Sequence, residues 1–349
     1  MRPLTQLLLA IFVTLVGSTA IDTNKRASPL AVSLTTSGNT EVKVAITNKG
    51  ATALNLLSKG TILDESAPVE KVQIFSANTQ IAFEGIRMRL LTSNLTQEFF
   101  TALAPGETKE LTVETASLHT MDKSGVFDVF ASGAIPYAEV GSTELIGTLS
   151  YASEKLSINV DGALASKVSK AISKRTILSS DCTGTKRTAV LNALSDCSSL
   201  AKAAASAAKA GTKITTYFKS SSAASTVAAR LNAVAAECSS SSSGATTTHC
   251  ADTYNGCSSN VLAYTVPSQN FIVYCDVYFS ALPLLASSCH AQDQATTTIH
   301  ENTHAPGVYS PGTQDYAYGF SSSTSLSASQ ALLNADTYAL YANAIHLNC

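Results

Sequence analysis

The segment His300-Glu301-Asn302-Thr303-His304 has the residue types and the spacing of a metal site that activates water. On a helix, residues four apart share one face, so both imidazoles could bind one ion while Glu301 points at a water on it. A catalytic zinc needs three protein ligands and an open position, and it lowers the pKa of its water towards about 7. The pattern predicts His300 and His304 as ligands and Glu301 as acid/base. The plainer alternative is an exposed helix face.

The third ligand is not supplied by this motif. The extended pattern H-E-x-x-H-x-x-G-x-x-H matches through Gly307 but has Ser310 at its last position. A downstream glutamate would serve instead, yet none follows Glu301, and Asp315 and Asp336 are the only acids that do. The sequence therefore leaves two candidate carboxylates.

Asp315 lies in the segment GTQDYAYG, and the prolines and glycines before it can turn the chain back towards the ion. If a helical turn begins near Thr313, Tyr318 shares a face with Asp315, and its phenol could donate a hydrogen bond to the oxyanion of a tetrahedral intermediate. Simple aromatic packing is the other interpretation of Tyr318. Asp336 falls on the apolar stripe of a C-terminal helix, where an unpaired carboxylate is costly. It either faces the cleft or replaces Asp315 as the ligand.

The N-terminus has the layout of a secretory signal peptide. Arg2 precedes an apolar run from Leu7 to Val16, which is too short to span a bilayer, and small residues follow up to Ala20. We expect residues 1–20 to be a signal peptide and the product to be secreted, extracellular and not in a membrane. The net charge of -2 argues against nucleic-acid binding, because phosphates require a concentrated basic surface.

Cysteine usage divides the chain into two parts. All eight cysteines lie in the second half, and an even number in an exported chain is most simply four disulfides. Residues 21–175 contain no cysteine and have short runs of alternating hydrophobicity, such as EVKVAITN, which predict a β-sandwich-like domain. The sequon that begins at Asn94 is a candidate N-glycosylation site.

The pair Lys174-Arg175 is a candidate cleavage site for a processing protease, although such pairs also occur as ordinary solvated charges. Cleavage there leaves all eight cysteines in residues 176–349, whereas cleavage after Arg187 would remove Cys182 and leave an odd thiol. We therefore predict a pro-domain over 21–175 and a mature domain over 176–349. Because it contains no cysteine, the pro-domain cannot inhibit the enzyme by coordinating the metal with a thiolate. It should block the cleft sterically or assist folding.

The second half is predicted to be mainly helical. Its alanine-rich segments, one ended by Gly211, have high helix propensity. The runs VLAYT and FIVYCDVYFS, separated by VPSQN, predict a hairpin or ribbon. Further helices are expected from Ser288 to Ala305 and from Ser325 to the C-terminus. The fold class is therefore α+β.

The stretch HENTHAPGVYSPGTQDYAYG closely resembles the signature of the deuterolysin family, the aspzincins, which are secreted fungal metalloproteases of the neutral protease 2 type. In that signature H-E-x-x-H is followed by G-T-x-D-x-x-Y-G. The resemblance implies that His300, His304 and Asp315 bind one Zn²⁺ per chain, that Glu301 is the catalytic acid/base and that Tyr318 assists in the transition state. It implies a zincin-like catalytic domain. It also implies that Asp336 favours basic side chains on the primed side of the scissile bond.

Disulfide pairing follows only from the same resemblance, because eight cysteines allow many connectivities. The family pattern implies Cys182 with Cys250, Cys257 with Cys275, and Cys289 with Cys349, and it leaves Cys197 with Cys238 as an additional pair.

These features together predict a monomeric zinc endopeptidase that is made as a zymogen. Its partners would be protein and peptide substrates, basic proteins among them, and its own pro-domain. A rival hypothesis is a secreted, non-catalytic surface or binding protein with a vestigial zinc motif, which predicts no tight zinc and no effect of Glu301→Gln. A serine hydrolase is disfavoured because the chain contains no G-x-S-x-G.

Overall fold

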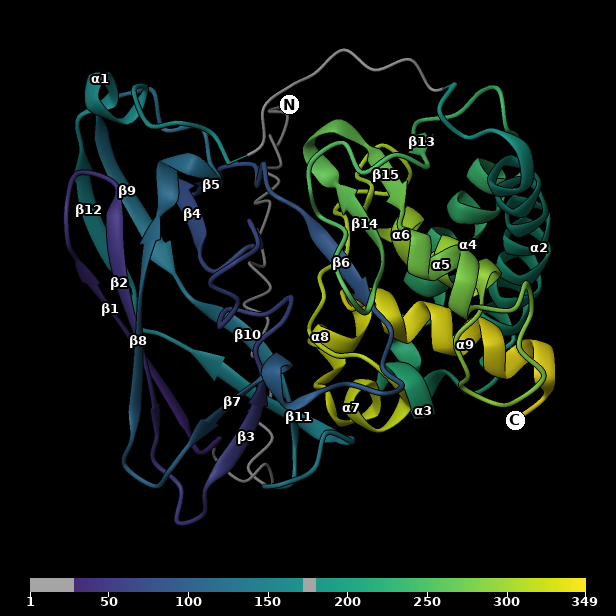
Figure 1. Ribbon diagram of the computed structural model, residues 1–349, viewed down its shortest axis with the longest axis horizontal. Coiled ribbons are helices and arrows are strands. Elements are labelled where there is room, and N and C mark those ends of the chain that lie inside the picture. Colours follow the sequence, from purple (N-terminus) through teal and green to yellow (C-terminus); the bar gives the residue numbers. More distant parts are fainter. Residues whose placement is uncertain (1–27, 172–179) are drawn as a thin grey trace, which may run out of the picture.

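A computed structural model of the protein describes residues 28–171 and 180–349. Strands dominate the N-terminal part and helices dominate the C-terminal part, and the two lie side by side (Figure 1). The expected α+β class is confirmed at this level. The predicted signal peptide and the pair Lys174-Arg175 lie outside the described residues. No helix among the described residues is long and apolar enough to cross a membrane.

The N-terminal part contains the strands of three sheets, with strand orders β1-β2-β8, β11-β10-β3-β7 and β12-β9-β4-β5. Alternating hydrophobicity produces them, as in β2, where Val42, Val44 and Ile46 are buried between more exposed neighbours. The strands are β1 (Leu30–Thr36), β2 (Glu41–Asn48), β3 (Leu54–Leu57), β4 (Gln73–Ser76), β5 (Thr79–Gln80), β6 (Arg87–Leu90), β7 (Phe100–Leu103), β8 (Thr108–Glu114), β9 (Gly125–Phe130), β10 (Ser132–Ala138), β11 (Leu145–Ala152) and β12 (Leu156–Val160), with short helices η1 (Gln97–Phe99), η2 (Thr115–Ser117) and α1 (Gly162–Ala165).

One apolar core joins these three sheets. It includes Ile46 of the first sheet, Leu56 and Ile135 of the second, and Ile74 and Val129 of the third, all without solvent exposure. Burial of this kind is the main stabilising contribution, at about 25 cal/mol per Å² of apolar surface. The cysteine-free part therefore has its own core.

The C-terminal part is built on two long alanine-rich helices that pack closely together. Ala201 and Ala204 of the first are fully buried, because small side chains let the helices approach, and Gly211 follows it with a φ of +75°. The elements are α2 (Gly184–Lys209), α3 (Ile214–Phe218), η3 (Ser221–Ala223), α4 (Ala224–Cys238), β13 (Thr247–His249), β14 (Val261–Val266), η4 (Pro267–Gln269), β15 (Phe271–Tyr274), α5 (Asp276–Ala281), α6 (Gln294–His304), α7 (Phe320–Ser325), α8 (Ala328–Leu332) and α9 (Ala335–Leu347).

The predicted hairpin is confirmed, but its second strand is shorter than expected. Strands β14 and β15 pair antiparallel, and the chain turns at Asn270, which has a φ of +49°. The strand ends at Tyr274, and residues 276–281 are helical instead. Asp276 lies in the first turn of this helix, where a carboxylate interacts favourably with the helix dipole, and the helix buries Tyr278.

Strand β6 leaves the N-terminal part and completes the sheet of the C-terminal part. The order of that sheet is β13-β15-β14-β6, and β6 lies along β14 between the two parts of the molecule (Figure 1). The pairing is antiparallel, with Met88 opposite Tyr264 and Arg89 opposite Ala263. The two halves of the sequence therefore share one sheet.

Four disulfides cross-link the C-terminal part, and no cysteine of the described residues is free. Three of them are the pairs that the family resemblance implied, and the fourth, Cys197–Cys238, is the additional pair that the resemblance left over. One of them, between Cys289 and Cys349, ties the loop before α6 to the residue that ends the chain after α9. The four pairs are Cys182–Cys250, Cys197–Cys238, Cys257–Cys275 and Cys289–Cys349.

Candidate metal centre

Helix α6 carries the H-E-x-x-H motif and begins later than predicted. Asp293 caps its N-terminus, because the carboxylate accepts a hydrogen bond from the backbone N–H of Thr296 at 2.6 Å. The helix ends at His304, just before Ala305 and Pro306. All of its residues are buried, so the motif is not the exposed helix face of the plainer interpretation.

Three side chains converge at the end of this helix. Nε2 of His300 and Nε2 of His304 lie 3.1 and 3.3 Å from Oδ1 of Asp315. One donor atom from each of these residues lies within 4.8 Å of the others. This is the arrangement that three ligands of one small cation require.

Asp315 reaches the site from an extended segment, and the conditional expectation of a helical turn near Thr313 is wrong. The segment is held on both sides: the N–H of Thr313 donates to the carbonyl of Thr303, and the N–H of Gln314 donates to the carbonyl of Leu333. Those bonds to α6 and to the residues before α9 use backbone groups that a helical turn would need internally. Asp315 and Tyr318 therefore do not share a helix face.

The donor atoms of this site have no other role in the protein. Both Nε2 atoms and both carboxylate oxygens of Asp315 are buried, and within residues 28–171 and 180–349 none of them has a hydrogen-bond partner. Buried polar atoms almost always have one, so a cluster of such atoms is suited to binding a cation. Two imidazoles and a carboxylate are a donor set that zinc accepts, and the residues present fit that ion.

The other nitrogen of each imidazole faces an acceptor. Nδ1 of His304 lies 3.0 Å from the carbonyl oxygen of Thr313, and Nδ1 of His300 lies 3.5 Å from Oδ1 of Asp336. The bond to Thr313 fixes the ring orientation of His304 and the tautomer that leaves its Nε2 free to bind a metal. Nδ1 of His300 has no hydrogen-bond partner among the described residues, so Asp336 is a charged neighbour of that ring and not a bonded one. Asp336 thus lies behind His300, on the side of the ring opposite to Asp315.

Burial and neighbouring groups together shift the pKa values of the two carboxyl groups in the site. Burial alone would raise the pKa of Asp315, but the neighbouring imidazoles of His304 and His300 outweigh this effect and hold the pKa below its ordinary value. For Glu301 burial prevails and raises the pKa to about 7, although His300 and the hydroxyl of Thr265 act in the opposite direction. A carboxyl group with that pKa can exchange a proton near neutral pH.

Glu301 is oriented by a residue that sequence reasoning missed. The hydroxyl of Thr265, on β14, donates a hydrogen bond to Oε2 of Glu301 at 2.6 Å, and Oε1 has no partner among the described residues. Thr265 carries no motif, and its only sequence signal is its place in the predicted strand. The contact leaves one oxygen of Glu301 free to act on a ligand.

Tyr318 lies beside His300, with its ring roughly parallel to the imidazole and the centroids 6.5 Å apart. Its hydroxyl donates a hydrogen bond to the backbone carbonyl of Met88, on β6, at 2.6 Å. Burial, together with the nearby Asp315 and Asp336, raises its pKa well above the ordinary value, so the phenol keeps its proton. Tyr318 is therefore a hydrogen-bond donor at the edge of the centre.

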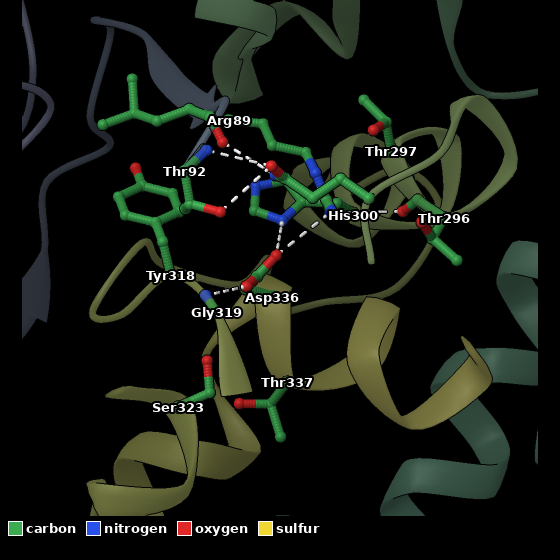
Figure 2. Close-up of polar contacts among 12 residues, drawn as sticks. Arg89, Thr92, Thr296, Thr297, His300, Tyr318, Gly319, Ser323, Asp336 and Thr337 are labelled. Atoms are coloured by element: carbon green, nitrogen blue, oxygen red, sulfur yellow. Dashed lines mark hydrogen bonds and ion pairs between the residues drawn. The ribbon is translucent and has the colours of Figure 1, made fainter. Parts of the chain in front are cut away.

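Asp336 is paired with an arginine from the N-terminal part of the chain. Figure 2 shows Arg89, His300 and Gly319 around the Asp336 carboxylate. Nη1 of Arg89 lies 3.2 Å from its Oδ1, and the N–H of Gly319 donates to its Oδ2 at 2.6 Å. Burial would raise the pKa of Asp336, but Arg89, His300 and the Gly319 bond outweigh it and lower the pKa. No local pattern marks Arg89 in the sequence.

The candidate glycosylation site lies on the surface. Asn94 is exposed and has a φ of +59°, in the left-handed region that asparagine tolerates in turns. Its position on the surface is compatible with an N-glycan, which stays a prediction.

A buried H-E-x-x-H helix that meets a carboxylate from a separate segment is typical of metal-dependent hydrolases. The sequence model of the "Deuterolysin metalloprotease (M35) family" matches residues 1–349. A "Neutral protease 2 homolog" of Phaeosphaeria nodorum is 62% identical over 351 residues, which cover 100% of both chains. One of Sclerotinia sclerotiorum is 49% identical over 92% of this chain and 91% of its own. The "Neutral protease 2" of Aspergillus oryzae is 44% identical over 99% of both. The chain belongs to the deuterolysin family of metalloproteases.

Proposed function

We propose that the protein is a secreted zinc endopeptidase that is made as an inactive precursor. Residues 1–20 would be the signal peptide, residues 21–175 the pro-domain and residues 176–349 the mature enzyme. The observation that carries the proposal is the meeting of His300, His304 and Asp315, whose donor atoms lie within 4.8 Å of one another. These three side chains would hold one zinc ion per chain.

Asp315 is the better candidate for the third ligand than Asp336. Its Oδ1 faces the Nε2 atoms of both histidines, whereas Asp336 faces only Nδ1 of His300. A ligand set that uses Nε2 of both rings would therefore be completed by Asp315. In this proposal Asp336 orients His300 and also binds basic side chains of the substrate, an assignment supported by its ion pair with the Arg89 guanidinium.

A zinc ion bound here would lower the pKa of a water molecule in its open position and polarise the carbonyl of the scissile peptide bond. Glu301, whose Oε1 has no partner among the described residues, would accept a proton from the attacking water and pass it to the leaving amine. Thr265 keeps the carboxylate in this orientation through its 2.6 Å hydrogen bond. Tyr318, still protonated, donates a hydrogen bond to the oxygen on which negative charge develops.

The rest of the chain is suited to an enzyme that acts outside the cell. Four disulfides cross-link residues 182–349, and such bonds persist in oxidising compartments. The substrates would be proteins and peptides, basic ones among them. Cleavage after Arg175 would release the mature part, which we expect to be a monomer.

Zinc dependence and the Glu301→Gln variant together test the proposal. The processed chain should cleave casein, lose this activity in a chelator and regain it with Zn²⁺. Glu301→Gln should retain stoichiometric zinc and lose activity by about 10²–10⁴-fold, the usual contribution of general acid–base catalysis. Cleavage that survives complete zinc removal would exclude the mechanism. Absence of both tight zinc and cleavage would favour the non-catalytic rival.

A further inference from the structure

Strand β6 lies at the metal centre in an extended conformation. It pairs antiparallel with β14, the strand that carries Thr265, and places Arg89 opposite Ala263 and Met88 opposite Tyr264. Peptides commonly bind to proteins by adding a strand to a sheet edge, with main-chain hydrogen bonds for affinity and side-chain pockets for specificity. Here the added strand comes from the same chain.

The Arg89 side chain fills a pocket of the C-terminal part. Its Nη1 lies 3.2 Å from Oδ1 of Asp336 and 3.3 Å from the carbonyl oxygen of Thr296, on α6. The side chains of Arg89 and Asp336 are only 2% and 3% exposed. A buried charge is strongly unfavourable without its partner, so this pair fixes β6 to α6 and α9.

The backbone of β6 also engages the candidate oxyanion donor. The Tyr318 hydroxyl, which would stabilise charge on a substrate carbonyl, donates instead to the carbonyl of Met88. The peptide bond between Met88 and Arg89 thus presents its oxygen to Tyr318, and the arginine after that bond enters the Asp336 pocket. A second segment of the N-terminal part, at Gly60, also lies close to Tyr318, because a Cβ added at Gly60 would be 3.2 Å from the Tyr318 hydroxyl.

The chain after β6 is held from both sides. The side-chain amide of Gln292, just before α6, donates to the carbonyl of Leu90 at 2.8 Å and accepts from the N–H of Thr92 at 3.0 Å. On the other side, the N–H of Leu91 donates to the carbonyl of Asn260 at 2.7 Å. These contacts are made through the main chain, so they would accept a peptide of almost any sequence.

The residues of the metal centre are closed to solvent, since His300, Glu301 and His304 have no exposure. Asp315 and Tyr316 border a cavity of about 40 Å³, whose other walls include Gly60, Glu70 and Arg87 of the N-terminal part. That volume suits a few water molecules and not a peptide. A protein substrate therefore reaches the centre only after a covering segment moves, and β6 is a segment that contacts both Tyr318 and Asp336.

We propose that residues 88–92 lie along the path of the peptide substrate, in the direction the substrate takes, and keep the enzyme latent until they are displaced. Arg89 acts as the anchor in the pocket for a basic side chain, and the Met88 carbonyl takes the place of the carbonyl that is attacked. Gln292 is then a positioning residue that binds the main chain of the substrate beyond the scissile bond. This inference rests on the proposed function.

The test uses the full-length chain with Lys174→Ala and Arg175→Ala, which keep the junction uncut. Into this chain we would introduce Arg89→Ala, Arg89→Lys or the control Arg87→Ala. Arg87 lies on the same strand, but its guanidinium binds Glu70 at 2.7 Å and lies over Phe83, both in the N-terminal part. The first readout is turnover of a short internally quenched peptide by the zinc-loaded chains. Arg89→Ala should raise turnover at least tenfold over the parent, while Arg87→Ala should not.

The second readout is hydrogen exchange in a Glu301→Gln background, where self-cleavage cannot interfere. Arg89→Ala should increase exchange at least tenfold in residues 88–92 and 261–266, with little change in strands β1, β2 and β8. If Arg89→Ala does not fold, Arg89→Lys serves, because a lysine ammonium is more strongly hydrated than a guanidinium and is less favourable to bury beside Asp336, and exchange should rise severalfold.

The inference would be overturned if the folded Arg89 variants kept the peptide turnover of the parent and also showed unchanged hydrogen exchange. Failure of the proposed function would give a different result, because the processed 176–349 chain would then show no zinc-dependent cleavage. Exchange in residues 88–92 would still report on the strand in that case.

Discussion

The Thr265 hydroxyl lies 2.6 Å from Oε2 of Glu301, so a strand side chain holds the proposed acid/base of the neighbouring helix. Thr265→Val should lower kcat by about 10- to 100-fold, because a hydrogen bond to a charged group contributes about 1.5–3 kcal/mol. KM and zinc content should change little. Steady-state kinetics and metal analysis of the processed chain check this.

Thr297→Val is the matched control for that variant. Thr297 is equally buried on α6, but its hydroxyl donates to the carbonyl of Asp293 at 2.7 Å and does not contact Glu301. Equal losses of kcat in the two variants would mean that Thr265 acts only through packing.

The two downstream carboxylates should differ in their effect on metal binding. Asp315→Ala removes a proposed ligand, and the processed chain should lose stoichiometric zinc. Asp336→Asn removes the charge behind His300 and alters the acceptor of the Gly319 N–H, but it removes no proposed ligand, and zinc affinity should fall by about 10- to 100-fold, as is usual for such partners. Competition with a chromogenic chelator measures both. The opposite order of effects would make Asp336 the ligand.

Much of the site could be predicted from the sequence because its main parts are local. The spacing of His300, Glu301 and His304 defines a helix face, and counting the remaining acids reduced the candidates for the third ligand to Asp315 and Asp336. The side chains of His300, His304 and Asp315 do converge. Each of these predictions depended on residues within one short stretch.

The remaining parts could not be predicted because they depend on tertiary contacts. Thr265 and Arg89 lie on β14 and β6, and nothing near either residue in the sequence indicates that it meets Glu301 or Asp336. The helical turn expected near Thr313 failed for the same reason, since Thr303 and Leu333 supply the backbone partners that hold the segment extended. Long-range pairing decided these features, and local propensity did not.

The disulfide between Cys289 and Cys349 should stabilise the C-terminal part and its activity. Replacing both residues with alanine should lower the free energy of unfolding by about 2–4 kcal/mol, as expected when a cross-link over a long loop is lost. It should also reduce kcat, because the bond ties the loop before α6 to the end of α9. Urea unfolding and peptide kinetics check the two effects.

The pair Cys182–Cys250 provides a control for this prediction, because it closes a loop of similar length but joins the residues before α2 to the residue after β13, and not α6 or α9. Its removal should destabilise the chain by a similar amount with little loss of kcat in the folded protein. An equal loss of kcat would contradict the link to α6 and α9.

Asp64 should make the N-terminal part sensitive to acid. Burial would raise its pKa, but hydrogen bonds from Gly60, Ser66 and Ala67 and the charge of Lys59 outweigh this and hold the pKa below 3.8. A depressed pKa stabilises the fold above the unfolded value, and this contribution is lost as the pH falls through the folded value. Asp64→Asn should therefore cost about 1.5–3 kcal/mol above about pH 5 and progressively less below about pH 4.

Thermal unfolding of the full-length chain from pH 7 to pH 2 measures this dependence. Asp122→Asn, at an exposed carboxylate, serves as the control and should follow the parent. A difference between Asp64→Asn and the parent that stays constant over the whole range would exclude the ionised carboxylate as its source.

Strand β6 has one more consequence, which concerns the solubility of the released enzyme. While it is present, β14 is an inner strand of its sheet. Once it departs, β14 becomes an edge with unpaired N–H and C=O groups, and such edges invite pairing with other chains. The same open edge that could capture a protein substrate could also capture a second enzyme molecule. A precursor that keeps this edge paired during folding and export would protect the protein from self-association.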